Sequence, residues 1–169
     1  MSDIRESIIN VRSALEAQAD AGPAPDRPAI AVIEDGLRCR AEGGDGWAVV
    51  TDMPAPVGGG GTAPTPGWLI RAALASCAAT TIAMRAAELE IALTRLEVRA
   101  ESETDMRGLL GAGDSVDPGP VRARLHVDLA AEEADEQRLE ELVRWADSHS
   151  PVGDCLRRAV AVELEIVVG

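Results

Sequence analysis

Six short segments of the chain carry the hydrophobic pattern of β-strands. In the last three, apolar and polar residues alternate, which is typical of a strand with one face in the core and the other in solvent. Three shorter apolar-leaning runs precede them and are separated by glycine-containing turns of the hairpin type. The predicted strands are residues 29–33, 37–41, 47–51, 95–101, 121–129 and 160–168.

Four other segments have helical spacing of their apolar residues. Residues 4–19 carry one apolar stripe, and residues 132–148 and 151–156 form two further predicted helices. The longest predicted helix, residues 66–90, is small or apolar on nearly every side. We therefore expect it to be central and buried. The order of elements predicts an α+β fold with mixed or antiparallel sheets rather than a doubly wound one.

The chain has 169 residues, enough for one main domain with an ordinary core. Residues 20–28 contain three prolines and are expected to end the first helix and form a linker. We therefore predict an N-terminal helix and linker at residues 1–28 and the main domain at residues 29–169. Residues 54–67, rich in proline and glycine, are predicted to be a flexible loop.

The charge balance excludes several classes of partner. Sixteen arginines, with no lysine, face 29 acidic residues and give a formal charge of −13. Nucleic-acid binding relies on neutralising phosphates, so it is not expected here. The most apolar segment, residues 68–87, contains Arg71 and Arg85 and is not expected to span a membrane. The chain begins without an apolar signal segment, which favours the cytoplasm.

Candidate chemistry centres on the three cysteines rather than on a metal or cofactor. His126 and His149 lie on different predicted elements and no Cys-x-x-Cys is present, so neither a metal nor a cofactor is predicted. Cys77 lies about three turns into the long helix, too far for its dipole to activate the thiol. By periodicity alone it is a small buried apolar residue, and a reactive Cys77 needs a cation from another element.

Three strings resemble the signature of the OsmC/Ohr family of osmotically induced and organic-hydroperoxide-resistance proteins. They are residues 65–77 (TPGWLIRAALASC), residues 105–108 (DMRG), and residues 149–152 (HSPV) followed by residues 156–157 and 160–164. The resemblance implies an OsmC-like fold of two intertwined chains, with long central helices packed against six-stranded sheets. It also implies a pair of redox cysteines, an arginine that stabilises the first thiolate and, in the Ohr branch, a glutamate. Dihydrolipoyl proteins are the usual reductants in that branch.

The resemblance assigns roles to particular residues. Cys77 falls at the position of the peroxidatic cysteine, whereas Ser150 stands where the resolving cysteine is expected and Gly67 where the Ohr glutamate is expected. The arginine corresponds to Arg38 or Arg40, and the choice between them stays open. Ser150 is also a good N-cap for a helix that begins at Pro151.

Two other cysteines are weaker candidates for a partner of Cys77. Cys155 lies five residues after Ser150, which turns its side chain about 140° around a helix. Cys39 lies between the two candidate arginines on a predicted hairpin.

Three hypotheses follow. The first is an enzyme, a homodimer that reduces organic hydroperoxides through Cys77 and an external thiol. The second is a homodimer without peroxidase activity that binds a small apolar or thiol-reactive ligand. The third is a structural, stress-associated protein, which the sequence does not separate from the second.

Overall fold

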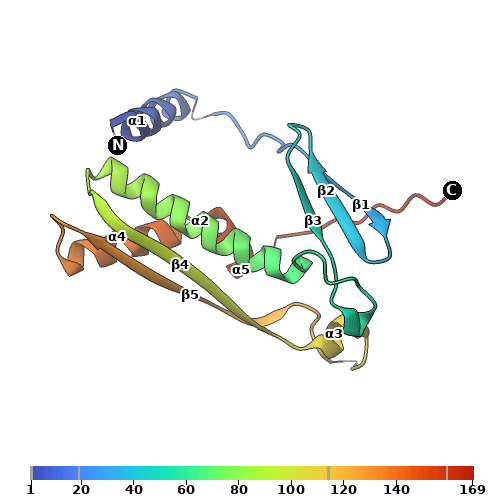
Figure 1. Cartoon of the computed structure of the whole chain (residues 1–169). Coiled ribbons are helices and arrows are strands. Elements are labelled where there is room, and N and C mark those ends of the chain that lie inside the picture. Colours follow the sequence, from blue (N-terminus) through green and yellow to red (C-terminus); the bar gives the residue numbers. More distant parts are fainter. Residues whose placement is uncertain (1, 19, 114, 159) are drawn as a thin grey trace. The chain divides into compact units, whose positions relative to one another are not determined.

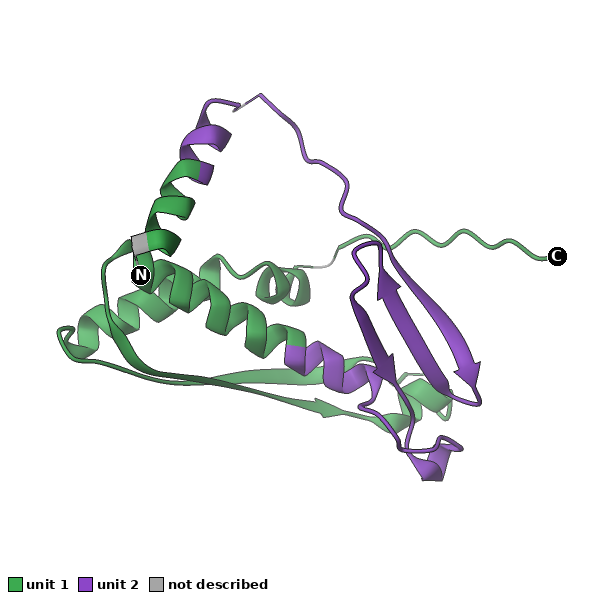
Figure 2. Ribbon diagram, turned by 45° about the horizontal axis from the view of Figure 1, so that its top comes forward, with its two compact units in different colours: residues 1–10, 73–169 green, residues 11–72 purple. Residues whose placement is uncertain are grey.

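The computed structural model describes every residue except Met1, Ala19, Asp114 and Ala159. The chain divides into two compact units, one of residues 1–10 and 73–169 and one of residues 11–72 (Figure 2). The elements along the chain (Figure 1) are α1 (Ser2–Glu16), β1 (Ala29–Asp35), β2 (Arg38–Gly43), β3 (Ala48–Thr51), η1 (Ala55–Val57), α2 (Pro66–Glu88), β4 (Leu93–Thr104), α3 (Met106–Leu110), β5 (Pro120–Ala131), α4 (Glu136–Ser148) and α5 (Pro151–Arg157).

In the unit of residues 11–72, β1, β2 and β3 form an antiparallel sheet in that order. The two hairpins turn at Gly36 and Gly46, whose φ angles of 55° and 80° lie in the left-handed region. Glycine adopts this conformation without the steric cost that a Cβ adds, so the turn predictions are confirmed.

The loop between β3 and α2 is organised around one buried carboxylate. Asp52 is 2% exposed. Its two oxygens accept hydrogen bonds from the amides of Met53, Gly60 and Thr62 at 2.7, 3.3 and 3.0 Å, and from the Thr62 hydroxyl at 2.9 Å. At Gly59, an added Cβ would lie 1.8 Å from the carbonyl oxygen of Met53. The prediction of a flexible loop is therefore wrong, because Asp52 supplies acceptors for backbone amides that lack strand or helix partners.

Replacing Asp52 with asparagine should destabilise this unit in a pH-dependent way. Hydrogen bonds, above all that from the Thr62 amide, lower the pKa of Asp52, although burial opposes this. A lowered native pKa adds stability above the unfolded value of about 3.9, and that stability is lost as the pH falls through the native pKa. The thermal midpoint of Asp52→Asn should therefore lie below that of the wild type at pH 7, with the difference shrinking towards pH 3. Equal differences at both pH values, or an equal effect of the exposed control Asp35→Asn, would contradict this.

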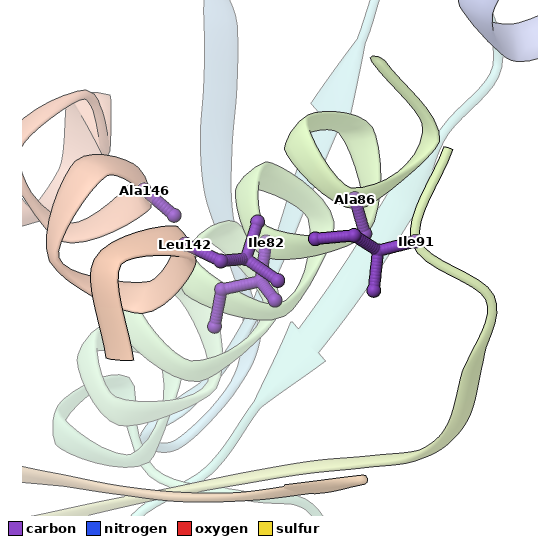
Figure 3. Packing of buried hydrophobic residues seen from close by; sticks show 5 residues of the cluster. All are labelled: Ile82, Ala86, Ile91, Leu142 and Ala146. Carbon is purple, nitrogen blue, oxygen red and sulfur yellow. The ribbon is translucent and has the colours of Figure 1, made fainter. Parts of the chain in front are cut away.

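In the other unit, the long helix packs on α4 and on the β4–β5 ribbon. The buried cluster comprises Ile82 and Ala86 from α2, Ile91 from the following turn, and Leu142 and Ala146 from α4 (Figure 3). Partly buried side chains from β4 and β5 cover this cluster. The β4–β5 pairing is antiparallel and sets Leu96 opposite Leu129 and Val98 opposite Val127. The alternation predicted from the sequence is thus confirmed for both strands.

The long helix was predicted to be buried all round, and this is only half right. One row of α2, from Leu74 through Ala78 and Ile82 to Ala86, is buried, whereas Ala73, Ser76, Thr80 and Met84 are exposed. A single chain covers only one face of the helix. By length and composition α2 is the one helix among the described residues that could cross a membrane, a test that the core helix of a soluble protein also passes.

The predicted strand at residues 160–168 is not formed. The segment has no regular secondary structure, and Val162 and Leu164 are 91% and 83% exposed. A strand requires hydrogen bonds from a neighbouring strand, and the described part of the single chain provides none for this segment. The described residues therefore form five strands, in a three-stranded and a two-stranded sheet.

Candidate functional site

The thiol of Cys77 contacts the hydroxyl of Ser150, 73 residues later in the chain. Ser150 is 1% exposed and lies at the N-cap of α5, as predicted. Its hydroxyl accepts a hydrogen bond from the Gly153 amide at 3.2 Å and donates one to Cys77 Sγ, also at 3.2 Å. The hydroxyl therefore accepts one hydrogen bond and donates another, and the thiol has a fixed polar neighbour within the unit of residues 73–169.

The short helix α5 is built so that a cation lies close to this contact. Pro151 occupies the first turn and Ser150 caps it. A Cβ on Gly153 would lie 3.1 Å both from Ser150 Oγ and from Arg157 Nη1, so glycine leaves room for the two groups to approach. Arg157 is held there by Asp147, whose backbone carbonyl and carboxylate accept its hydrogen bonds at 3.2 and 2.5 Å.

A stack of side chains fixes the end of α4 that leads into Ser150. The rings of Trp145 and His149 lie 3.9 Å apart at 12°, and the Arg85 guanidinium lies 4.3 Å from the Trp145 ring. His149 Nδ1 lies 2.7 Å from the carbonyl oxygen of Trp145. Because Arg85 belongs to α2 and His149 precedes Ser150, the stack ties α2 to the residue that carries the hydroxyl. The sequence placed these residues on helices but did not reveal their stacking.

The two candidate arginines lie in the other unit, on β2. Arg38 donates to the Thr62 hydroxyl at 2.8 Å and to Glu34 at 3.3 Å, so it is attached to the loop that Asp52 organises. Arg40 pairs with Glu42, and this hydrogen bond raises the pKa of Arg40. Cys39, between them, is half-buried. Which of the two acts on Cys77 stays a prediction.

The structure also describes the other positions that the sequence singled out, Cys155 and Gly67. Cys155 is exposed on α5, and it is Ser150 that contacts Cys77. All three cysteines are free. Gly67 carries no carboxylate, and a Cβ added there would meet only Thr65 Oγ1, at 3.9 Å. No group of three or more metal-binding side chains gathers among the described residues.

A pocket of about 520 Å³ is lined by residues of α2, β5, α4 and α5, and its lining residues do not include Cys77 or Ser150. Its apolar wall includes Leu74, Ala78 and Ile82 of α2, and Leu74 and Ala78 lie three residues before and one residue after Cys77. Leu125 and Val127 of β5 continue this wall. The end formed by α5 and α4 is polar, with Gly153, Arg157 and Asp147. This volume is within the range of small-molecule sites, about 300–1,000 Å³.

These features define an α+β domain in which a long helix presents a thiol to the cap residue of a short one. A family model described as OsmC-like protein matches residues 58–165. The chain therefore belongs to the OsmC-like protein family, as its sequence strings indicated.

Solved structures share the fold at low sequence identity. An OsmC-like protein from Mycoplasma pneumoniae has 14% identity and a TM-score of 0.68, over 81% of this chain and 91% of that one. An organic hydroperoxide resistance protein OsmC from Legionella pneumophila has 21% identity and a TM-score of 0.59, over 80% and 92%. The organic hydroperoxide resistance protein OhrB of Bacillus subtilis has 22% identity and a TM-score of 0.51, over 83% and 97%. A comparison with curated proteins finds no match.

Proposed function

We propose that this protein reduces organic hydroperoxides through Cys77 and depends on an external thiol to complete the cycle. Family membership supports the reaction class, and two of the similar structures are named organic hydroperoxide resistance proteins. The observation that carries the external-thiol requirement is the 3.2 Å contact from Ser150 Oγ to Cys77 Sγ. The group that faces the thiol is a hydroxyl, which cannot form a disulfide.

The reaction balances with one hydroperoxide and two external thiol groups. The Cys77 thiolate attacks the terminal oxygen of ROOH, the O–O bond breaks, and the leaving alkoxide takes a proton to become ROH. Cys77 is then a sulfenic acid. An external thiol condenses with it to give a mixed disulfide and water, and a second thiol releases reduced Cys77 and the oxidised reductant.

In this mechanism Ser150 acts as a hydrogen-bond donor. Donation to sulfur favours the charged form of a thiol, so the Ser150 hydroxyl stabilises the nucleophilic thiolate. The Gly153 amide keeps the hydroxyl oxygen in place as an acceptor. The positive charge is proposed to come from Arg38 or Arg40, as the family resemblance implies, and the choice between them stays open.

Turnover of cumene hydroperoxide with dihydrolipoamide tests this function. The wild type should consume hydroperoxide at a rate that saturates with the dithiol, and Cys77→Ser should abolish the activity. Cys155→Ser is the matched control, because this exposed thiol is expected to leave the rate unchanged. Equal rates for the wild type and Cys77→Ser would refute the proposal.

A second candidate function is a homodimer that binds a small apolar or thiol-reactive ligand without peroxidase activity. The absence of a second thiol at Ser150 and of a carboxylate at Gly67 favours it, together with the pocket that Leu74 and Ala78 of α2 line. The two functions differ in the state of the thiol. Fast alkylation of Cys77 by iodoacetamide at pH 6 supports the enzyme, whereas slow alkylation with no turnover supports the binding protein.

The assembly that accompanies either function is proposed to be a cytoplasmic homodimer. The exposed face of α2 and the exposed residues 160–168 support association with a second copy, because they leave apolar side chains in water. Residues 1–28 are proposed to be an appendage to the main domain. Within the first unit, the Arg5 side chain of α1 donates to the carbonyl oxygen of Glu88, at the end of α2, at 3.3 Å.

A further inference from the structure

The corner between α4 and α5 carries Ser150, and the hydrophobic core cluster ends before it. On α4 the cluster extends to Ala146, whereas His149 is the C-cap residue, is exposed, and has φ −114° and ψ 12°. Within α5, the Gly153 amide donates to the Ser150 hydroxyl. That contact does not reach α2, on which Cys77 lies. The distance between the hydroxyl and the thiol therefore depends on what holds the corner against α2.

The ring of His149 holds this corner. Its imidazole is stacked on the indole of Trp145, with centroids 3.9 Å apart and planes at 12°. Its Nδ1 lies 2.7 Å from the carbonyl oxygen of Trp145. A carbonyl oxygen only accepts hydrogen bonds, so this nitrogen carries a proton and donates it. The imidazole is thus fixed by a stacking contact and a hydrogen bond, one residue before Ser150.

The indole of Trp145 is itself held from α2. The guanidinium of Arg85 lies 4.3 Å from the centroid of the Trp145 ring, and its Nη1 donates to Glu88 at 3.0 Å. Arg85 Nε is buried and has no hydrogen-bond partner among the described residues. A buried donor without an acceptor is rare in native structures, and cation–π attraction to the indole is the contact that keeps this guanidinium in place.

We infer that His149 is a positioning residue, which holds the Ser150 hydroxyl against the Cys77 thiol. The contacts form a closed path that leaves α2 at Arg85, passes through Trp145, His149 and Ser150, and returns to α2 at Cys77. The two ends of the path are eight residues apart on α2, about 12 Å along the helix. The inference rests on the proposed function, in which the hydroxyl stabilises the thiolate.

The pH profile of Cys77 alkylation by iodoacetamide tests this inference, in a background of Cys39→Ser and Cys155→Ser that leaves one thiol. Because the thiolate is the form that reacts, the pH of half-maximal rate measures how well the protein stabilises it. Ser150→Ala should raise this midpoint by about 0.7 pH unit, as expected for the loss of one hydrogen bond. His149→Ala should raise it by about half as much.

A double-mutant cycle separates positioning from a general structural effect. If His149 acts through Ser150, adding His149→Ala to Ser150→Ala should shift the midpoint no further, whereas independent effects would add. His149→Phe keeps an aromatic ring on Trp145 and should return the midpoint most of the way to the wild-type value. The matched control is His126→Ala, at the other histidine, which is exposed on β5 and should leave the midpoint unchanged.

Additive shifts in the cycle, or a wild-type midpoint in either His149→Ala or Ser150→Ala, overturn the inference. If His149→Ala does not fold, Trp145→Leu removes the same stack and takes its place in the cycle, and a wild-type midpoint there also overturns it. The profile uses no hydroperoxide, so its result does not depend on turnover. Loss of turnover with the expected shifts would refute the proposed function alone, and turnover with additive shifts would refute this inference alone.

Discussion

Ser150→Cys should convert Cys77 from a thiol that needs an external partner into one that forms an internal disulfide. The serine Oγ lies 3.2 Å from Cys77 Sγ, so a sulfur at that position is close to the bonding distance of about 2.05 Å. After one equivalent of cumene hydroperoxide, the sulfenic acid on Cys77 should condense with the introduced thiol and release water. Dimedone, which traps sulfenic acids, should therefore label Cys77 in the wild type and not in Ser150→Cys.

The same substitution should lower the stability of the reduced protein. Ser150 caps α5, and loss of a serine N-cap costs about 0.5–2 kcal/mol.

The disulfide prediction has its own control, which is Ser150→Cys in a background of Cys39→Ser and Cys155→Ser. In that background the only two thiols left face each other. Two titratable thiols that persist after hydroperoxide treatment, with dimedone labelling at the wild-type level, would show that the two side chains do not meet in solution.

Local pattern was sufficient to predict most of the elements. Apolar alternation identified β4 and β5, and the proline and glycine positions identified the start of α2 and the hairpin turns of β1 to β3. It failed where structure depends on partners distant in sequence. The order of the loop after β3 comes from one carboxylate, Asp52, that reaches amides up to ten residues later, which no periodicity records.

The residues of the candidate site could also be predicted only in part. Cys77 and Ser150 could be predicted because the family strings contain them, and the structure adds the hydrogen bond between them. The positions of Arg157 and of the Trp145–His149 stack depend on how α4 and α5 pack, and they could not be predicted from helical spacing. Gly153 was likewise uninformative until its neighbours were known, since a glycine in a helix ordinarily lowers stability.

Placing a charge on the apolar side of residues 160–168 should abolish the homodimer. Val162, Leu164 and Ile166 recur at every second position and are 91%, 83% and 71% exposed. An extended chain with this pattern becomes a stable strand when a sheet edge provides hydrogen bonds and its apolar face is covered. We expect a second copy of the chain to provide both. Leu164→Asp should then shift the protein from dimer to monomer, as measured by sedimentation equilibrium across a range of concentrations.

Glu163→Gln provides the matched control, since residue 163 points to the opposite side of an extended segment and its charge is not expected to matter for association. If Leu164→Asp associates as strongly as Glu163→Gln and the wild type, the segment does not contribute to the dimer. If the wild type is itself monomeric at concentrations of about 10 µM, far above the nanomolar dissociation constants of stable interfaces, the homodimer proposal fails. The peroxidase proposal would then apply to a single chain, with the Cys77–Ser150 contact unchanged because both residues lie within one unit.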